Sequence, residues 1–334
     1  MEKDMQQIED THESKQQREI DEHFMRRCLQ LAVNGMRNAK PNPMVGAVIV
    51  SEDGRIIGEG YHVRCGEGHA EVNAFASVKP ADEPLLSAST IYVSLEPCSH
   101  WGKTPPCADL IVSKGVRRVV CGTIDPFAKV CGRGVQRIRE AGIEVTIGVL
   151  EKECIALNRR FMTVNEKHRP YIILKWAQTL NGIIGPNLKI STPFTRMLVH
   201  KLRTENEAIL VGHETLLDDH PKLNVRHWVG PEPERIVLSH SSEDVPEGFH
   251  QFDNIDAVLS HLYDEGRQNL LVEGGAITLQ GFLDGNLWDE IRVETAPFTM
   301  PDGTHAPALP NDAQLVNSQV YDGNVIRKFV RASI

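Results

Sequence analysis

The sequence has 334 residues, 41% hydrophobic and 24% charged, a balance typical of a globular protein of about two domains. Its formal net charge of −9 argues against a protein that wraps nucleic-acid phosphates, because such proteins usually present a basic face. The charged N-terminus contains no apolar run suited to a signal peptide or membrane span, and an odd count of scattered cysteines fits a reducing compartment. We therefore expect a cytoplasmic protein with no membrane and no nucleic-acid partner.

The N-terminal part of the chain predicts a tail followed by a helix. Residues 1–19 are strongly polar, and we interpret them as a mobile tail. Apolar residues then recur at helical spacing from Phe24 to Ala32, and Gly35 is well placed to end this helix.

The next segment alternates strand and helix patterns. Residues 44–62 predict two strands joined at Asp53 and Gly54, a dipeptide favoured in tight hairpin turns. Further strands are expected within 90–98, 117–126 and 143–150, and helices within 69–78, 105–115 and 134–142. This alternation predicts an α/β domain over residues 20–165.

A second domain is expected over residues 170–334. A helical pattern covers 151–166, residues 167–170 read as a linker, and 171–177 predict an opening strand. Two later segments, 203–212 and 267–275, repeat the strand pattern.

The stretch PCSHWGKTPPC, residues 97–107, raises the question of whether its Gly-Lys-Thr binds phosphate. A Walker loop needs a glycine five residues before Gly102, and that position is Pro97. The Walker interpretation therefore fails, and a metal site or a prolyl turn remains.

A metal site is favoured when GHAEVNA, residues 68–74, is considered with this stretch. His69, Cys98 and Cys107 supply one imidazole and two thiolates, a donor set suited to zinc with the fourth position open. Glu71 lies two residues after His69, so both reach one site only near the first turn of a helix. The sequence predicts these three zinc ligands with Glu71 as a nonligand carboxylate.

This combination indicates hydrolytic deamination. A zinc-bound water becomes a nucleophile near neutral pH, and an adjacent carboxylate can take its proton and pass it to a leaving amine. Zinc deaminases combine His-x-Glu with Pro-Cys-x-x-Cys, and this chain departs only in having eight residues between Cys98 and Cys107. We predict Glu71 as the catalytic residue.

Two other interpretations remain open at this level. A nucleic-acid or nucleoside deaminase would share the His-x-Glu core but would not need such a second domain. A structural zinc would need a fourth protein ligand, and His100 is the residue that could supply it.

Several segments together resemble the bifunctional deaminase/reductase family of riboflavin biosynthesis. They include PNPMVGAVIV, GEGYH, GHAEVNA, LEPCSHWGKTPPC, DPFAKVCGRG, PYIILKWAQTLNG, EAILVGHETLLDDHPKLNVR and NLLVEGGAITLQGFL. The resemblance covers nearly all of the chain after the tail. It implies a cytidine-deaminase-like three-layer domain, then a dihydrofolate-reductase-like domain that reduces the ribosyl group to ribityl with NADPH.

The resemblance also implies a substrate and its contacts. The substrate is 2,5-diamino-6-ribosylamino-4(3H)-pyrimidinone 5′-phosphate, a phosphorylated pyrimidine, and the family allows a homo-oligomer. The implied substrate-binding residues are Asn42, His100, Lys103 and Thr104 in the first domain and Arg203, Leu223, Arg226 and Glu273 in the second. A lysine and a hydroxyl held between prolines also make a plausible anion clamp on physical grounds.

The cofactor site in the second domain follows from the resemblance too. Residues 270–283 read as a strand, a diglycine turn and a helix whose amides can receive phosphate. The implied NADPH-binding residues are Ala177, Lys189, Thr215, Asp219, Gly275, Ala276, Ile277, Thr278, Leu279, Gln280 and Gly281.

The second domain departs from the family pattern at three positions. Asn181 replaces an acid, Lys189 replaces a tryptophan expected near the nicotinamide, and His220 stands where a second aspartate is common. The segment between Gly185 and Ser191 is also shorter. An alternative prediction is therefore a deaminase whose reductase domain is impaired or altered in specificity.

Overall fold

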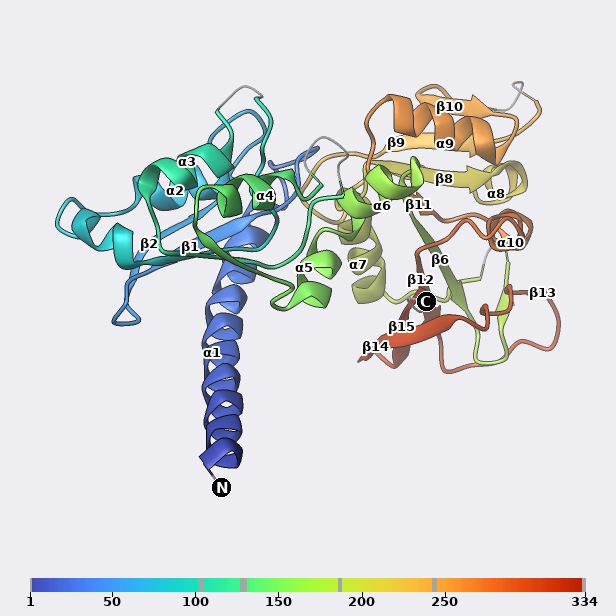
Figure 1. Cartoon of the computed structure of the whole chain (residues 1–334). Helices are drawn as coiled ribbons and strands as arrows, with labels where there is room; N and C mark the ends of the chain where they lie inside the picture. Colours follow the sequence, from blue (N-terminus) through green and yellow to red (C-terminus); the bar gives the residue numbers. More distant parts are fainter. Residues whose placement is uncertain (1, 102–104, 127–130, 186–187, 242–244, 332–334) are drawn as a thin grey trace. The chain divides into compact units, whose positions relative to one another are not determined.

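The chain forms two compact units, Met1–Glu166 and Lys167–Ile334 (Figure 1). The computed structural model describes residues 2–101, 105–126, 131–185, 188–241 and 245–331, with side chains from residue 15 onward. In these residues no helix is both long enough and apolar enough to cross a membrane. The predicted division, 20–165 and 170–334 with a linker between, lies close to this observed boundary.

The first unit contains the expected helices and strands except at its N-terminus and over residues 151–166. Its helices are α1 (Glu2–Ala32), α2 (Ala70–Ala76), α3 (Cys107–Lys114), α4 (Arg133–Glu140), α5 (Glu151–Leu157) and α6 (Arg159–Lys167), with 3-10 turns at Val33–Gly35 and Glu83–Ala88. Its strands are β1 (Gly46–Val50), β2 (Ile56–Tyr61), β3 (Thr90–Val93), β4 (Arg118–Cys121) and β5 (Glu144–Ile147).

These elements make three layers around a mixed sheet of order β2-β1-β3-β4-β5. The β1–β2 and β1–β3 pairs are antiparallel, and β3, β4 and β5 run parallel. Successive side chains of β1 point to opposite faces: Ile49 packs with α2 and α3, whereas Val48 packs with α1 and α5. The predicted α/β class and the three-layer arrangement are both confirmed.

The expected mobile tail is helical. Helix α1, the long blue helix in Figure 1, runs from Glu2 to Ala32 and includes residues that we assigned to a separate tail. The segment contains no glycine or proline, and Glu22 pairs with both Arg18 and Arg26 one turn away. High intrinsic helix propensity therefore extends the helix beyond its apolar part.

The helix expected over residues 151–166 is divided in two. Asn158 ends α5, and its side chain bonds to the backbone N–H and C=O of Met44, each at 2.8 Å. This buried side chain satisfies the backbone of a distant loop instead of facing solvent on a continuous helix. Periodicity alone could not indicate such a contact.

The second unit is again α/β. Its helices are α7 (Pro193–Thr204), α8 (His213–Asp219), α9 (Ile255–Asp264) and α10 (Ala276–Asp284). Its strands are β6 (Tyr171–Gln178), β7 (Ile183–Ile184), β8 (Ala208–Gly212), β9 (Glu234–Leu238), β10 (Phe249–Phe252), β11 (Asn269–Val272), β12 (Glu290–Thr295), β13 (Thr304–His305), β14 (Ala313–Tyr321) and β15 (Asn324–Arg331).

The main sheet has eight strands in the order β10-β9-β8-β11-β6-β12-β15-β14. The strands from β10 to β12 are parallel, and β15 and β14 continue the sheet antiparallel. Helices α9 and α10 cover one face, while α7 and α8 cover the other. Because parallel strands share one carboxyl edge, the residues that follow β6, β8, β9 and β11 come together there.

Candidate functional site

The three predicted zinc ligands converge in the first unit. His69 Nδ1 lies 3.5 Å from Cys98 Sγ and 3.4 Å from Cys107 Sγ. The three ligand atoms all lie within 4.8 Å of one another, and His100 does not belong to this cluster. The described residues therefore provide a three-ligand set, which favours a catalytic metal over a closed structural one.

Local structure explains how distant residues meet. His69 occupies the N-cap position of α2, and Gly60 lets that helix approach β2, since an added Cβ would lie 2.5 Å from Ala70 O. Cys107 is the first residue of α3, and its backbone N–H donates to Cys98 Sγ at 3.3 Å. The two sulfur atoms therefore lie together although eight residues separate Cys98 from Cys107 in the sequence.

Glu71 lies beside the three ligands in the first turn of α2. Its side chain is 3% exposed, and its carboxyl group hydrogen-bonds with the Cys107 thiol. Burial, reinforced by the charge of Cys98, raises the pKa of Glu71 to about 7. The expected placement of His69 and Glu71 around a helix start is confirmed.

The chemistry of the donor set fits zinc. Hydrogen bonds from Cys107 and His69 lower the pKa of the Cys98 thiol, which favours the thiolate needed by a metal ligand. The hydrogen bond to Cys98 in turn raises the pKa of His69. One imidazole and two thiols that are buried or half-buried form a ligand set that Zn²⁺ commonly takes.

Asn42 is held beside the metal cluster by a residue that sequence reasoning missed. Its side-chain amide lies 3.1 Å from His62 Nε2, and the His62 ring lies 5.2 Å from the ring of His69. His62 is buried and ends the GEGYH segment, which supported the family resemblance without His62 being predicted as a site residue. His100 is half-buried, while Lys103 and Thr104 lie outside the described residues.

Glu96 was also missed. Its buried carboxylate accepts hydrogen bonds from the backbone N–H groups of Gly132 and Gly134, at 2.8 and 2.9 Å, and of Asp125. It therefore joins the strand end that precedes Cys98 to the start of α4. A buried carboxylate at a helix N-terminus is favourable because the unpaired N–H groups there need acceptors.

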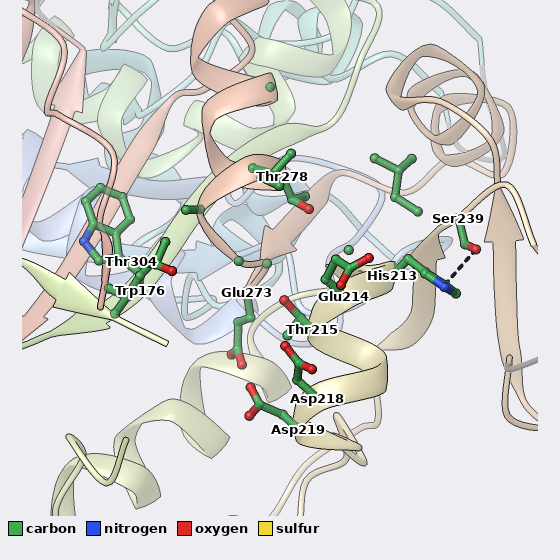
Figure 2. Close-up of a pocket in the computed structure, with 18 of the residues that line it drawn as sticks. Trp176, His213, Glu214, Thr215, Asp218, Asp219, Ser239, Glu273, Thr278 and Thr304 are labelled. Atoms are coloured by element: carbon green, nitrogen blue, oxygen red, sulfur yellow. Dashed lines mark hydrogen bonds between the residues drawn. The ribbon is translucent and has the colours of Figure 1, made fainter. Parts of the chain in front are cut away.

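A cavity of about 810 Å³ opens at the carboxyl edge of the second sheet (Figure 2). Its lining comes from the ends of β6, β8, β9 and β11 and from the starts of α8 and α10. Figure 2 shows Glu273, Asp218 and Asp219 on one side, and His213 bonded to Ser239 at 2.9 Å. The volume suits a large organic cofactor.

Glycines shape the wall of this cavity at the start of α10. A Cβ added at Gly274 would lie 2.7 Å from Thr278 Cβ, and one at Gly275 would lie 2.9 Å from Thr215 Oγ1. Both positions lack room for a side chain, so the backbone amides remain accessible. This cradle, at the N-terminus of a nine-residue helix, fits the phosphate groups of a dinucleotide.

Most predicted cofactor residues line this cavity. They are Ala177, Thr215, Asp219, Gly275, Ala276, Ile277, Thr278 and Gly281. Three others are placed differently: Leu279 packs in the core, Gln280 Nε2 donates to Asp284, and exposed Lys189 is not among the lining residues. His213 and Ser239 line the cavity without having been expected from the sequence.

Two predicted substrate residues form a buried ion pair. Arg203 Nη2 lies 2.7 Å from Glu273 Oε2, and both side chains are 10% exposed. Arg203 Nη1 also donates to Asn224 O at 3.0 Å. Burial alone would raise the pKa of Glu273, but the charges of Arg203 and Lys175 lower it overall, so the carboxylate is charged at neutral pH.

The segment after Asn224 carries Arg226, which is exposed. Its backbone N–H donates to Nδ1 of His200, a side chain only 1% exposed. Burial, followed by the charges of Arg203 and Arg226, lowers the pKa of His200 to about 4, so this imidazole is a neutral acceptor. The remaining predicted substrate residue, Leu223, is buried and has φ +48°.

One departure from the family pattern, Asn181, has a local structural explanation, and a second, His220, lies at a helix end. Asn181 Nδ2 donates to Met300 O at 2.7 Å, while its Oδ1 accepts from Met300 N–H and from Thr179. An aspartate could not donate to that carbonyl. His220 occupies the C-cap of α8 with φ +42°.

Comparison with known proteins matches both units to families. Residues 18–123 match the cytidine and deoxycytidylate deaminase zinc-binding region, and residues 170–325 match the RibD C-terminal domain. The chain is 39% identical over 327 residues to the riboflavin biosynthesis protein RibD of Aquifex aeolicus, covering 86% of this chain and 89% of that protein.

Solved structures give the same relationship. A deaminase/reductase from Thermotoga maritima, named for diaminohydroxyphosphoribosylaminopyrimidine and 5-amino-6-(5-phosphoribosylamino)uracil, has a TM-score of 0.83 and 34% identity, covering 95% of this chain and all of that one. RibD of Acinetobacter baumannii has a TM-score of 0.82 at 29% identity, with the same coverage. The similarity therefore extends over both units.

Proposed function

The chain belongs to the RibD family of bifunctional riboflavin biosynthesis enzymes, and on that premise we propose how its residues perform the two reactions. The enzyme catalyses a deamination and a reduction and uses Zn²⁺ and NADPH. We infer that deamination acts on 2,5-diamino-6-ribosylamino-4(3H)-pyrimidinone 5′-phosphate and that the reduction converts the ribosyl group of its product to ribityl. The substrates in the name of the Thermotoga relative support this inference.

In the first unit His69, Cys98 and Cys107 would hold the zinc. When bound there, the ion supplies an activated water near neutral pH. Glu71 takes a proton on its carboxylate and returns it to the amine that leaves the ring. The single observation that carries this assignment is the burial of Glu71 against the ligands, because its carboxyl group hydrogen-bonds with the Cys107 thiol and its pKa responds to the charges of Cys98 and His69.

The pyrimidine would be oriented by the loop that carries Asn42. The contact between Asn42 and His62 fixes the amide close to the metal cluster, so its polar atoms can recognise the ring. His100 lies two residues after Cys98 and is near enough in sequence to meet the same substrate. Lys103 and Thr104 remain predictions for the phosphate.

In the second unit the large cavity would hold NADPH, which supplies a hydride to the ribosyl carbon. The amides that begin α10 receive phosphate, while Thr215 and Asp219 on α8 bound the opposite wall. Trp176 also lines the cavity and gives it an aromatic surface. The protein residues therefore orient the cofactor without needing a strong acid or base.

The substrate of the reduction would meet Glu273 and Arg226. Glu273 stays charged against Arg203, and its carboxylate lines the cavity, where it can orient ribose hydroxyl groups. Arg203 positions Glu273, whereas exposed Arg226 is available for the phosphate. The prediction that both arginines bind phosphate is therefore narrowed to Arg226, with Arg203 as a positioning residue.

The departures at Asn181, Lys189 and His220 are compatible with a working reductase. Asn181 makes three local hydrogen bonds, Lys189 does not line the cavity, and His220 caps a helix. The alternative, a deaminase with an impaired second domain, would require changes in the residues that line the cofactor cavity.

The binding partner, the cellular location and the oligomeric state of the enzyme are also expected from the sequence or the family. The partner is a small phosphorylated pyrimidine rather than nucleic acid, in keeping with the net charge of −9. A cytoplasmic location and a homo-oligomer follow from the sequence and from the family resemblance respectively, and both stay predictions.

One assay tests both reactions. Purified enzyme is given the diaminopyrimidinone ribose phosphate, and ammonia release and NADPH oxidation are followed in the same sample. Glu71→Gln should lower ammonia release by roughly 10²- to 10⁴-fold, keep its zinc, and still reduce the deaminated intermediate when this is supplied.

The matched control is Glu67→Gln, an exposed carboxylate four residues earlier. Full ammonia release by Glu71→Gln would refute the catalytic assignment, and absence of NADPH oxidation with the intermediate would favour the deaminase-only alternative.

A further inference from the structure

A second cluster of metal-ligating side chains lies in the reductase unit, at the edge of its sheet. Glu234 begins β9, His250 lies on the edge strand β10, and His261 lies on α9. Glu234 Oε1 is 2.7 Å from both His250 Nδ1 and His261 Nε2. The three ligand atoms lie within 4.8 Å of one another.

The supporting structure keeps these side chains directed at one point. Strand β10 pairs in parallel with β9, and Asn254 caps α9 by accepting from Ala257 N–H at 2.8 Å. The ring of Phe252 packs against the ring of His261 with centroids 5.1 Å apart. The two imidazole rings are nearly perpendicular, at 75°, so each presents a nitrogen edge to the carboxylate.

We propose that Glu234, His250 and His261 form a second site for a divalent transition metal, of which Zn²⁺ is the expected ion. Two imidazole nitrogens and one carboxylate oxygen make a donor set that zinc takes in proteins with a further position left for water. None of these residues belongs to the deaminase site or lines the cofactor cavity.

The cluster of Glu234, His250 and His261 is accessible to an incoming metal ion and includes an acidic side chain. The His250 side chain is 57% exposed, and the residue borders a small cavity of about 450 Å³ together with Glu232 and Glu234. Glu234 is itself 11% exposed, and its Oε1 faces both histidine nitrogens.

Metal binding would replace the present hydrogen bonds. Each nitrogen that faces Glu234 gives up its hydrogen, by a change of tautomer in a neutral ring or by release of a proton from a charged one. One nearby cation opposes the ion: Arg267 Nε lies 3.5 Å from Glu234 Oε2. Arg235 also borders the small cavity, but its guanidinium lies over the ring of Phe249.

The consequence for the protein is structural. A bound ion would join the start of β9 to β10 and α9, three elements at one edge of the sheet. Because a ligand that binds only the folded state stabilises it, unfolding of the reductase unit should shift to higher temperature as the metal is added.

The test uses the full-length enzyme with the deaminase site already filled with zinc. Co²⁺ is titrated into the protein, and its visible absorption and the metal content per chain are measured. A second equivalent of Co²⁺ should bind with the absorption spectrum of an ion ligated by nitrogen and oxygen. The absence of a thiolate charge-transfer band distinguishes this site from binding at cysteines. His250→Gln and His261→Gln should each weaken this binding about tenfold or more, since even outer-shell changes cost that much.

Matched variants complete the test. His305→Gln changes an exposed histidine of the same unit and should leave the second equivalent unchanged, whereas Arg267→Gln should tighten it by removing the opposing charge. Retained deaminase zinc and an unchanged circular dichroism spectrum establish that a variant is folded, and Glu234→Gln provides a further ligand variant. No second equivalent in the unaltered enzyme, or binding that survives loss of either histidine, overturns the proposal.

Discussion

The two units build their sites in different ways. In the first unit His69, Cys98 and Cys107 converge with buried Glu71 beside them, and we propose that these four side chains carry the chemistry themselves. In the second unit a cavity of about 810 Å³ is bordered by the ends of several parallel strands. A metal site therefore depends on the identities of a few residues, whereas a cofactor site depends on a cavity shape to which many residues contribute.

Removing one zinc ligand should have the largest effect and should affect only the first unit. Cys98→Ser should lose bound zinc and ammonia release completely, because a hydroxyl is a poor replacement for a thiolate. The first unit should also lose stability, since metal binding is coupled to folding. Zinc content and ammonia release measure the effect, and reduction of the supplied intermediate should continue.

Its control is Cys131→Ser, which alters an exposed cysteine of the same unit. That variant should keep both zinc and activity. Zinc retained at full occupancy by Cys98→Ser would contradict the assignment of the ligand set.

A second prediction concerns the ion pair in the reductase unit. Glu273→Gln leaves Arg203 buried without its counter-charge, which should cost about 3 kcal/mol of unfolding free energy. Denaturant unfolding followed by tryptophan fluorescence reports mainly this unit, which contains Trp176, Trp228 and Trp288. Glu247→Gln, an exposed change, should have no effect, and deamination should be unaltered in both variants. An unchanged midpoint in Glu273→Gln would show that the pair adds no stability.

A third prediction uses pH. His200 has an ordinary pKa of 6.5 and a pKa of about 4 in the folded protein, so the unfolded chain takes up the proton first as the pH falls. The reductase unit should therefore lose stability between pH 6.5 and about 4, by up to roughly 3 kcal/mol. His200→Asn keeps an acceptor for Arg226 N–H but does not titrate, so its stability should depend less on pH in that range. Equal pH dependence in both proteins would exclude His200 as the cause.

The smallest expected effect comes from Asn181→Asp, which restores the acid usual in the family. Loss of the hydrogen bond to Met300 O should cost about 1 kcal/mol of unfolding free energy, while the Michaelis constant for NADPH stays nearly unchanged. Steady-state kinetics and thermal unfolding measure the two quantities. A large gain in reductase activity would instead mean that Asn181 impairs the enzyme.

Several features of the fold were predictable from local sequence. The Asp53-Gly54 dipeptide predicted the β1–β2 hairpin, and alternation of strands and helices predicted the first α/β unit, whereas the fold of the second unit followed from the family resemblance. The region around residue 158 was not predictable, because Asn158 ends a helix by bonding to Met44, which lies 114 residues away. The length of α1 was misjudged since its apolar positions cover only part of a longer helix.

Deaminase chemistry could be inferred from residue types alone, because His69, Glu71, Cys98 and Cys107 form a specific combination in two segments that each contain a recognisable helix start. The other residues that support the sites became identifiable only from long-range contacts in the fold. His62, Glu96 and His200 act through hydrogen bonds to other segments, and Glu234, His250 and His261 meet only after β9, β10 and α9 have packed. Such contacts depend on long-range packing, which leaves no periodic pattern or fixed spacing in the chain.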